Sequence, residues 1–237
     1  VTDNDGRIGM DLETVVIGPA MITFASNRSG EYDIYRMQAD GSGEGAVDVT
    51  DDDELFPDLV RGTRSDIAYA AEDGQSWNIW TVDVDGGSLS PLTSQTASNQ
   101  IQPSWTYDAS QIAYASNTAQ TPSTTTWEIY LMDADGGNVE QLTEQSPSWA
   151  IAPACSPVND DVAFVSDADS SGDSSVWLMQ SGTAEEVFDP GAGERAGDAS
   201  PAVTIASVAL SLPAGAGISR PSWSPDGTLL VVSVSDS

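Results

Sequence analysis

The chain has 237 residues and carries 37 Asp and Glu side chains against seven basic ones, all of them Arg, for a formal net charge of −30. This charge repels nucleic-acid phosphates and anionic membranes, so we expect neither nucleic-acid binding nor membrane insertion. The sequence contains no His, no Lys and a single Cys. These absences exclude His-based triads, Schiff-base lysines, His- or Cys-bound zinc and an internal disulfide within these residues.

A short phrase recurs along the chain at a nearly constant distance. It consists of a polar residue, Ile, an aromatic residue and a stretch that ends in Asp-Gly, and it occupies residues 33–41, 78–86 and 128–136, with a shorter copy at 175–182. The glycines that end the four copies lie 45, 50 and 46 residues apart. A period of about 40–50 residues indicates one supersecondary unit used several times, as in a propeller or a solenoid.

Each repeat is predicted to form four short strands. A segment containing Pro comes first, as in 102–105, and an apolar run follows (22–26, 67–70, 112–115 and 162–165). The repeated phrase is the third strand, and a strand ending in Val-Thr or Leu-Thr is the fourth (49–50, 92–93 and 142–143). These runs are rich in β-branched and aromatic residues and are separated by Gly, Asp and Asn, which is typical of strands and turns.

Four strands at this period favour an all-β fold, a β-propeller of about five or six four-stranded blades. We predict one propeller domain over residues 1–237, in which the Ala/Gly-rich segment 190–219 is either a degenerate blade or an insertion. Residues 1–6 are similar to the end of the repeated phrase, whereas 221–234 are similar to the first half of a blade, with 229–234 as its second strand. We therefore expect the N- and C-terminal strands to share the last blade. The alternative is that these strands pair with another subunit.

The repeat resembles that of TolB-like propellers, whose blades contain Pro-Asp relatives of the WD repeat. Residues 220–227 (Arg-Pro-Ser-Trp-Ser-Pro-Asp-Gly) match the first half of that blade, and 128–136 followed by Leu142-Thr143 match the second half. The resemblance covers about 17–189 and 220–237. The second repeat lacks the Trp of the pattern, and the fourth has Cys155 in its place, which we interpret as a buried core residue. Because such propellers are commonly exported, the resemblance implies an extracellular, cell-surface or periplasmic protein, present here in its mature form.

One acidic loop is the candidate metal site. Asp167, Asp169 and Asp173 alternate with Ser and Gly, the oxygen-rich composition that calcium prefers, and calcium is the only cofactor that the sequence suggests. The competing interpretation is a solvated polar loop. For the Asp pairs 3/5, 83/85 and 133/135 we favour turn formation, as for Asp226, and for the run 51–54 we favour a solvated stretch of charge.

The sequence predicts no catalytic residues. The favoured function is a non-catalytic exported propeller that acts as a protein-interaction or structural scaffold and self-assembles, with calcium, into an extracellular or surface structure. The expected partner is another protein or a second copy of the chain. The alternatives are a periplasmic TolB-like partner-binding protein and the propeller part of a larger hydrolase.

Overall fold

The computed structural model of the chain describes residues 21–48, 50–62, 65–74, 76–118, 126–144, 148–167, 174–180, 183–188 and 217–235. Within these ranges the chain forms β-strands and turns and no helix, which confirms the predicted all-β class. None of these residues therefore forms a helix of the length and apolarity needed to cross a membrane. The chain divides into two compact units, 1–96 with 100–103 and 97–99 with 104–237.

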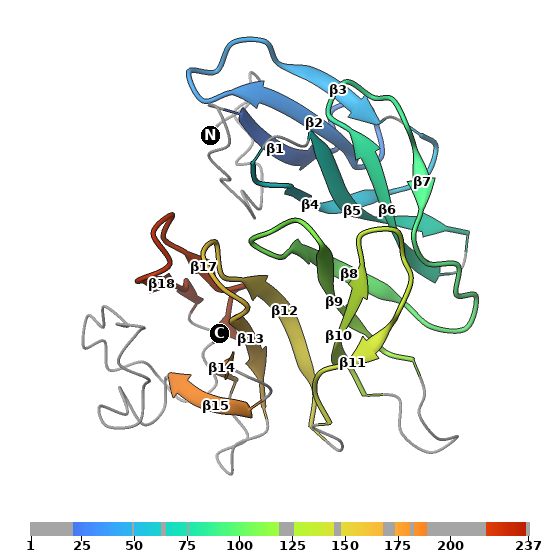
Figure 1. Ribbon diagram of the computed structural model, residues 1–237. Helices are drawn as coiled ribbons and strands as arrows, with labels where there is room; N and C mark the ends of the chain where they lie inside the picture. The colour runs from blue at the N-terminus through green and yellow to red at the C-terminus, as the bar shows by residue number, and fades with distance from the viewer. Residues whose placement is uncertain are drawn as a thin grey trace. The chain divides into compact units, whose positions relative to one another are not determined.

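The first unit contains two antiparallel sheets (Figure 1). The first sheet has the strand order β1-β2-β3, and the second has the order β4-β5-β6-β7. The strands are β1 (Met21–Ser26), β2 (Asp33–Gln38), β3 (Gly45–Asp48), β4 (Glu54–Leu59), β5 (Asp66–Asp73), β6 (Ser76–Asp83) and β7 (Ser90–Pro91). The second sheet is therefore the predicted four-stranded repeat, in sequence order.

The second unit repeats this arrangement twice and adds a hairpin. Two sheets have the orders β11-β10-β9-β8 and β12-β13-β14-β15, and β16 pairs with β19 as β17 pairs with β18. Residues 100–103 of β8 are grouped with the first unit. The strands are β8 (Gln100–Trp105), β9 (Gln111–Ser116), β10 (Glu128–Asp133), β11 (Glu140–Gln141), β12 (Ala150–Cys155), β13 (Val162–Ser166), β14 (Ser175–Gln180), β15 (Thr183–Phe188), β16 (Gly217–Ile218), β17 (Ser222–Trp223), β18 (Leu230–Val231) and β19 (Val234–Ser235).

The C-terminal hairpin corrects one detail of the prediction. We expected a single strand over 229–234, and the structure has two short strands, β18 and β19, on that side of the hairpin. The backbone N–H of Ser219 still donates to the carbonyl of Ser233 (2.9 Å), so the two sides remain paired between the short strands. The ladder is interrupted near Pro221, which has no N–H to donate.

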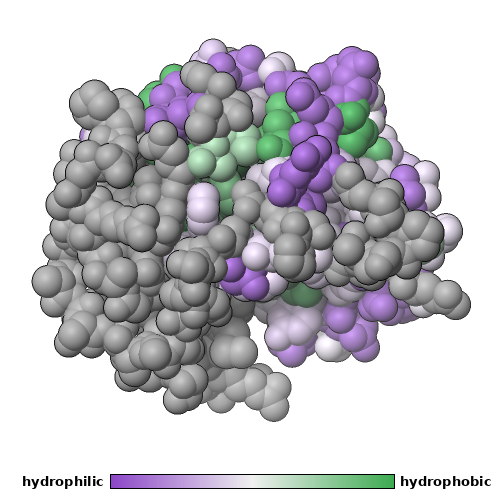
Figure 2. Space-filling view, turned by 90° about the horizontal axis from the view of Figure 1, so that it is seen from below, coloured by the Kyte–Doolittle hydropathy of each residue, from purple (hydrophilic) through white to green (hydrophobic). Residues whose placement is uncertain are grey.

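Hydrophilic side chains predominate among the described atoms on one face of the molecule, with small hydrophobic patches between them (Figure 2). The large hydrophobic residues that are exposed among the described residues are Leu89, Tyr107, Val139, Val158, Leu229 and Val231. Of the other large apolar side chains in the strands, those whose burial is described are buried or half-buried.

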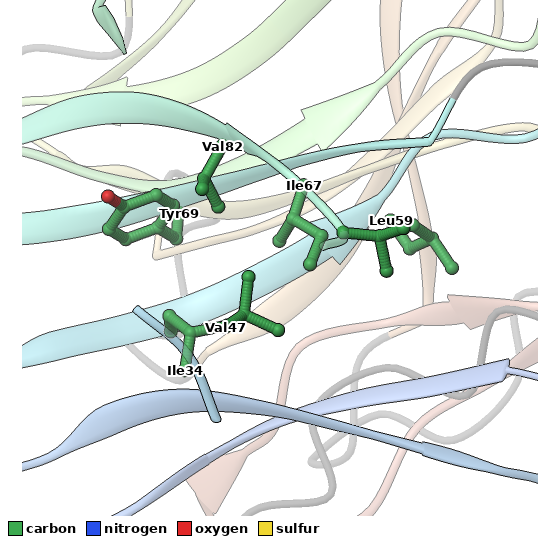
Figure 3. Packing of buried hydrophobic residues seen from close by; sticks show 7 residues of the cluster. Ile34, Val47, Leu59, Ile67, Tyr69 and Val82 are labelled. Atoms are coloured by element: carbon green, nitrogen blue, oxygen red, sulfur yellow. The ribbon is translucent and has the colours of Figure 1, made fainter. Parts of the chain in front are cut away.

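The core of the first unit lies between its two sheets. Ile34 and Val47 of the first sheet face Leu59, Ile67 and Tyr69 of the second, as Figure 3 shows. Val82 and Val84 complete this cluster. The alternation of side chains along each strand places these residues on one face of each sheet, where burial stabilises each by roughly 1.5–3 kcal/mol.

A cross-strand aromatic pair recurs in the sheets. The pairs Phe24–Tyr35, Tyr114–Tyr130 and Phe164–Trp177 are directly opposite in register, with ring centroids 5.9, 5.8 and 6.5 Å apart. One ring comes from the apolar run and the other from the repeated phrase. The sequence therefore showed both positions of the pair, and the register of the two strands brings them together.

The first strand of each four-stranded sheet contains a strained residue before a proline. Phe56, Gln102 and Ala152 have φ values of 58°, 56° and 55° and precede Pro57, Pro103 and Pro153. The pairing register shifts at this point in β4 and in β12, as expected for a β-bulge at a residue that cannot donate to the ladder. Left-handed backbone at a residue with a side chain costs about 1–3 kcal/mol.

Several predictions fall outside the described residues. These are the terminal strand at 1–6, the segment 190–216 and the strand expected before β1. The count of five or six blades, the shared last blade and the single domain over 1–237 therefore remain predictions. The described sheets comprise one of three strands, three of four strands and the paired strands of the C-terminal hairpin.

Candidate functional site

The predicted metal loop is described only at its first residue. The Asp167 carboxylate accepts a hydrogen bond from the backbone N–H of Trp149 (2.8 Å), and the Asp167 carbonyl accepts one from Ser148 Oγ (3.4 Å). Asp167 thus ties the end of β13 to the segment before β12. Asp169 and Asp173 lie outside the described residues. In the described part of the chain, no three His, Cys, Asp or Glu side chains are grouped so as to hold a metal ion.

The Asp pairs of the repeated phrase form turns, as the sequence predicted. The Asp83 carboxylate accepts hydrogen bonds from the backbone N–H of Asp85 (2.9 Å) and from Ser65 Oγ (3.0 Å). The equivalent loop of the second unit has Asp135 accepting from the backbone N–H of Gly137 (2.9 Å). These carboxylates satisfy backbone donors of their own loops. Asp3 and Asp5 are outside the described ranges.

A second type of acidic turn joins the first and second strands of the repeat. Asp108 accepts hydrogen bonds from the Ser110 backbone N–H (3.0 Å) and the Thr106 hydroxyl (2.9 Å). Asp226 accepts from the Ser224 hydroxyl (2.6 Å) and the Thr228 backbone N–H (3.1 Å). These donors lower the pKa of Asp108 and of Asp226 below the usual range, so both remain ionised at neutral pH.

The topology gathers these turns at one end of the second unit. In an antiparallel meander, the loop between strands one and two and the loop between strands three and four emerge on the same side. Figure 1 shows the β8–β9, β10–β11, β12–β13 and β17–β18 loops at the upper ends of their sheets. We call residues 106–110, 134–139, 156–161 and 224–229 the loop end of the second unit.

The loops of this end contact one another. The backbone N–H of Ala134 donates to the carbonyl of Ser110 (2.9 Å), which joins the β10–β11 loop to the β8–β9 loop. A Cβ added to Gly227 would lie 2.3 Å from Val158 Cγ2, so the β17–β18 and β12–β13 loops are in van der Waals contact. Within the loop end of the second unit, one pair of loops is therefore joined by a backbone hydrogen bond and the other pair by van der Waals packing.

Exposed apolar side chains occur in each of these loops. Tyr107, Val139, Val158 and Leu229 are 41, 55, 50 and 36% exposed, and each comes from a different loop. The same loops contain Asp108, Asp135, Asp160 and Asp226 and no basic residue. Single exposed hydrophobic residues are common on protein surfaces. These four share one further feature, because each lies on a loop that contacts another loop of the same end.

Sequence reasoning missed a recurring polar cluster at the start of the third strand. Thr143 Oγ1 donates to the buried carboxylate of Glu128 (2.6 Å) and accepts from the Ile129 backbone N–H (2.9 Å). In the first unit, Thr93 makes the same two contacts with Asn78 (3.1 Å) and with the backbone N–H of Ile79 (2.8 Å). The signal was present in the Leu-Thr endings at 92–93 and 142–143, together with the polar residue before Ile. Its role is to join the third and fourth strands.

The prediction of a solvated run at 51–54 is wrong for Glu54. Asp51 and Asp52 are exposed, whereas Glu54 begins β4 and is only 1% exposed. Burial raises the pKa of Glu54 to about 7, opposed by the hydrogen bond from Thr50 and reinforced by the charges of nearby acids. Cys155 is 2% exposed, which confirms its assignment to the core.

Comparison with known proteins identifies the fold. No protein-family model matches the chain, and no curated protein sequence matches it significantly. Among solved structures, a protein assigned as TolB from Agrobacterium tumefaciens superposes with a TM-score of 0.66 at 21% identity, over 92% of this chain and 72% of that protein. TolB from Acinetobacter baumannii gives 0.64 at 19% identity, over 90% of this chain and 46% of that protein. The chain has a TolB-like propeller fold.

The same fold also occurs in enzymes. A puromycin hydrolase superposes with a TM-score of 0.52 at 16% identity, over 68% of this chain and 26% of the hydrolase. The TolB-like chain thus spans less than half of the Acinetobacter protein and about a quarter of the hydrolase. The likeness establishes the fold, and function has to be argued from the surface.

Proposed function

We propose that this TolB-like chain is a non-catalytic, exported binding module, periplasmic as the resemblance suggests, and that the loop end of its second unit binds a protein partner. The observation that carries this proposal is the set of four exposed apolar side chains, one on each of four loops that contact one another in two pairs. A surface that is rigid before binding loses little conformational entropy when a partner docks. Apolar anchors surrounded by polar groups are the usual composition of protein interfaces.

The acidic groups that are described support binding over catalysis. Asp83, Asp108, Asp135, Asp167 and Asp226 each accept hydrogen bonds from nearby donors, and in each case these bonds organise a turn or the end of a strand. A pair of carboxylates with separated roles, as glycosidases use, requires one acid in an apolar site facing a substrate cleft. Glu54 is buried, and the groups that act on it, the Thr50 hydroxyl and the acids at 33, 48 and 52, belong to its own unit and, among the described residues, outline no substrate cleft.

The binding experiment compares matched loop variants. The wild-type chain is immobilised and used to capture proteins from the cells that produce it, beside the variants Tyr107→Ser with Val139→Ser and, as a control, Leu89→Ser. Leu89 occupies the same repeat position as Val139 and is 50% exposed, but belongs to the first unit. We expect one protein to be captured by the wild type and by the control, with at least about tenfold less recovered by the double variant, since interface anchors contribute 1–2 kcal/mol each or more. Equal recovery by all three proteins would refute the assignment of this surface.

Two other functions remain as proposals with separate tests. The chain is the propeller part of a larger hydrolase if the full-length protein contains a catalytic domain, which the gene sequence on either side would reveal. Self-assembly with calcium predicts particles that grow on adding calcium and dissociate in chelator, measured by light scattering. The likeness to a puromycin hydrolase, of which this chain covers 26%, supports the first of these alternatives.

A further inference from the structure

Glu54 is a buried carboxyl group with an unsatisfied oxygen. It is 1% exposed, and its Oε2 atom has no hydrogen-bond partner among the residues that the structure describes. Its Oε1 atom accepts a hydrogen bond from the hydroxyl of Thr50. A buried carboxylate with one oxygen that accepts no hydrogen bond has a high free energy, because a low-dielectric site lacks the donors that water would supply to the ionised form.

In the described part of the chain, the charges that act on Glu54 are negative. Asp33 on β2, Asp48 on β3 and Asp52 in the preceding connection raise the free energy of its ionised form. Tyr69 on β5 faces the same cluster and donates its hydroxyl to Asp48 (2.5 Å). Asp33 is itself buried and accepts from the Thr50 backbone N–H (3.3 Å). The elements packed around Glu54 therefore supply acids and a phenol as its ionisable neighbours.

The segment before Glu54 joins the two sheets of the first unit. The Asp53 carboxylate accepts from the Tyr32 backbone N–H (2.8 Å), and the Glu54 backbone N–H donates to the Tyr32 carbonyl (2.6 Å). The Asp53 carbonyl accepts from the Glu72 backbone N–H at the end of β5 (2.9 Å). We call residues 50–53 the connector. Its hydrogen bonds tie the loop before β2 to β4 and β5.

We propose that Glu54 is a proton-dependent clasp, which holds the connector against the two sheets of the first unit when it is protonated and loosens the connector when it ionises. This inference concerns the first unit and is independent of the proposed binding surface in the second. The neutral carboxyl tolerates the buried, acid-lined site. The carboxylate is repelled by Asp33, Asp48 and Asp52 and gains stability if it moves toward water.

The sign of the pH dependence follows from the direction of the shift. The folded protein holds the Glu54 proton up to about pH 7, whereas the unfolded chain releases it near 4.5. Between these values the folded state binds more protons, so the stability of the closed connector falls as pH rises, and it is lowest above pH 7. The difference of about 2.5 units between the folded and the unfolded pKa of Glu54 sets an upper limit of roughly 300-fold on the change in the equilibrium constant for opening of the connector.

Hydrogen exchange measured by mass spectrometry tests the clasp. Peptides that cover 50–59 are followed from pH 5 to 9 in the full chain, after correction for the intrinsic pH dependence of exchange. In the wild type we expect the protection of the connector to fall at least tenfold between pH 5 and about 7 and to level off above that. The Glu54→Gln variant should stay protected throughout. Glu140→Gln removes the same charge from an exposed site in the second unit and should behave as the wild type.

A second variant keeps the proposal testable if Glu54→Gln fails to fold. Asp52 is exposed, and Asp52→Asn removes one of the charges that oppose ionisation while leaving Glu54 in place. We expect the pH at which protection levels off to move to a lower value. Constant protection in the wild type, a parallel loss in Glu54→Gln, or an unmoved levelling-off pH in Asp52→Asn would each overturn the clasp.

Discussion

Replacing Gly86 by Ala should destabilise the first unit more than the same change at Gly41. The two glycines end equivalent copies of the repeated phrase, and both have a φ of 83°. They differ in their surroundings: a Cβ at Gly86 would lie 2.8 Å from the backbone oxygen of Val47, whereas a Cβ at Gly41 would have no described atom within 4 Å. Val47 belongs to the core cluster of Figure 3, so its backbone is fixed by packing.

The magnitude follows from these two differences. Left-handed backbone costs an alanine about 1–2 kcal/mol, and the stiffer unfolded chain returns about 0.4–1 kcal/mol of this. Gly41→Ala should therefore lower the free energy of unfolding by about 1 kcal/mol. Gly86→Ala adds a clash with a backbone atom, and overpacking typically costs a further 1–3 kcal/mol. We expect a total of about 2–4 kcal/mol for Gly86→Ala.

Urea unfolding followed by tryptophan fluorescence measures both variants, at an ionic strength that screens the large net charge. Asp85→Ala is the local control, because its ion pair with Arg36 (2.9 Å) is exposed and should contribute less than about 1 kcal/mol. Equal losses for Gly41→Ala and Gly86→Ala would refute the reasoning, since they would mean that the β6–β7 turn does not press on β3. A change in the slope against urea would instead indicate an altered unfolded state.

Three further predictions concern the second unit. Trp223→Phe should lower the free energy of unfolding by about 1–2 kcal/mol, because the indole N–H donates to the carbonyl of Ala154 (2.8 Å) and the variant leaves that carbonyl without this donor. Thermal unfolding measures the change, and an unchanged midpoint would contradict a stabilising role for this hydrogen bond. Asp226→Ala should lower the urea midpoint at pH 7. Because the pKa of Asp226 is lowered in the folded state, the difference from the wild type should shrink as pH falls below 4. A difference that is independent of pH would argue against the turn hydrogen bonds. Cys155, at 2% exposure, should react with a thiol reagent at least tenfold more slowly in the native protein than in urea, and rapid native labelling would place it at the surface.

The local features of this fold were predictable from the order of the residues. The repeated phrase became β2, β6, β10 and β14, and the apolar runs became β1, β5, β9 and β13. Strand formation and tight turns depend on side-chain alternation and on residues such as Asp and Gly within a few positions, so they are visible in the sequence. The turn role of Asp83, Asp135 and Asp226 followed for the same reason.

Burial and neighbourhood were decided by tertiary packing. Glu54 follows three aspartates and resembles them in sequence, yet it begins a strand that enters the core, where Asp33 and Asp48 surround it from two other strands. Asp167, chosen for its loop composition, instead bonds the backbone of Trp149, 18 residues away. Tyr107, Val139, Val158 and Leu229 have no shared sequence pattern, and only the meander topology places their loops at one end of the second unit.

The sequence by itself thus determined the strands, the turns, the repeat and the large negative charge, because these depend on residue type and short spacing. The tertiary structure decided which carboxyl group lost water, which exposed residues share a surface and which glycine has no room for a Cβ. Each of these depends on segments that are distant in the chain, and the free energy of a buried charge or a close contact is set by those distant neighbours.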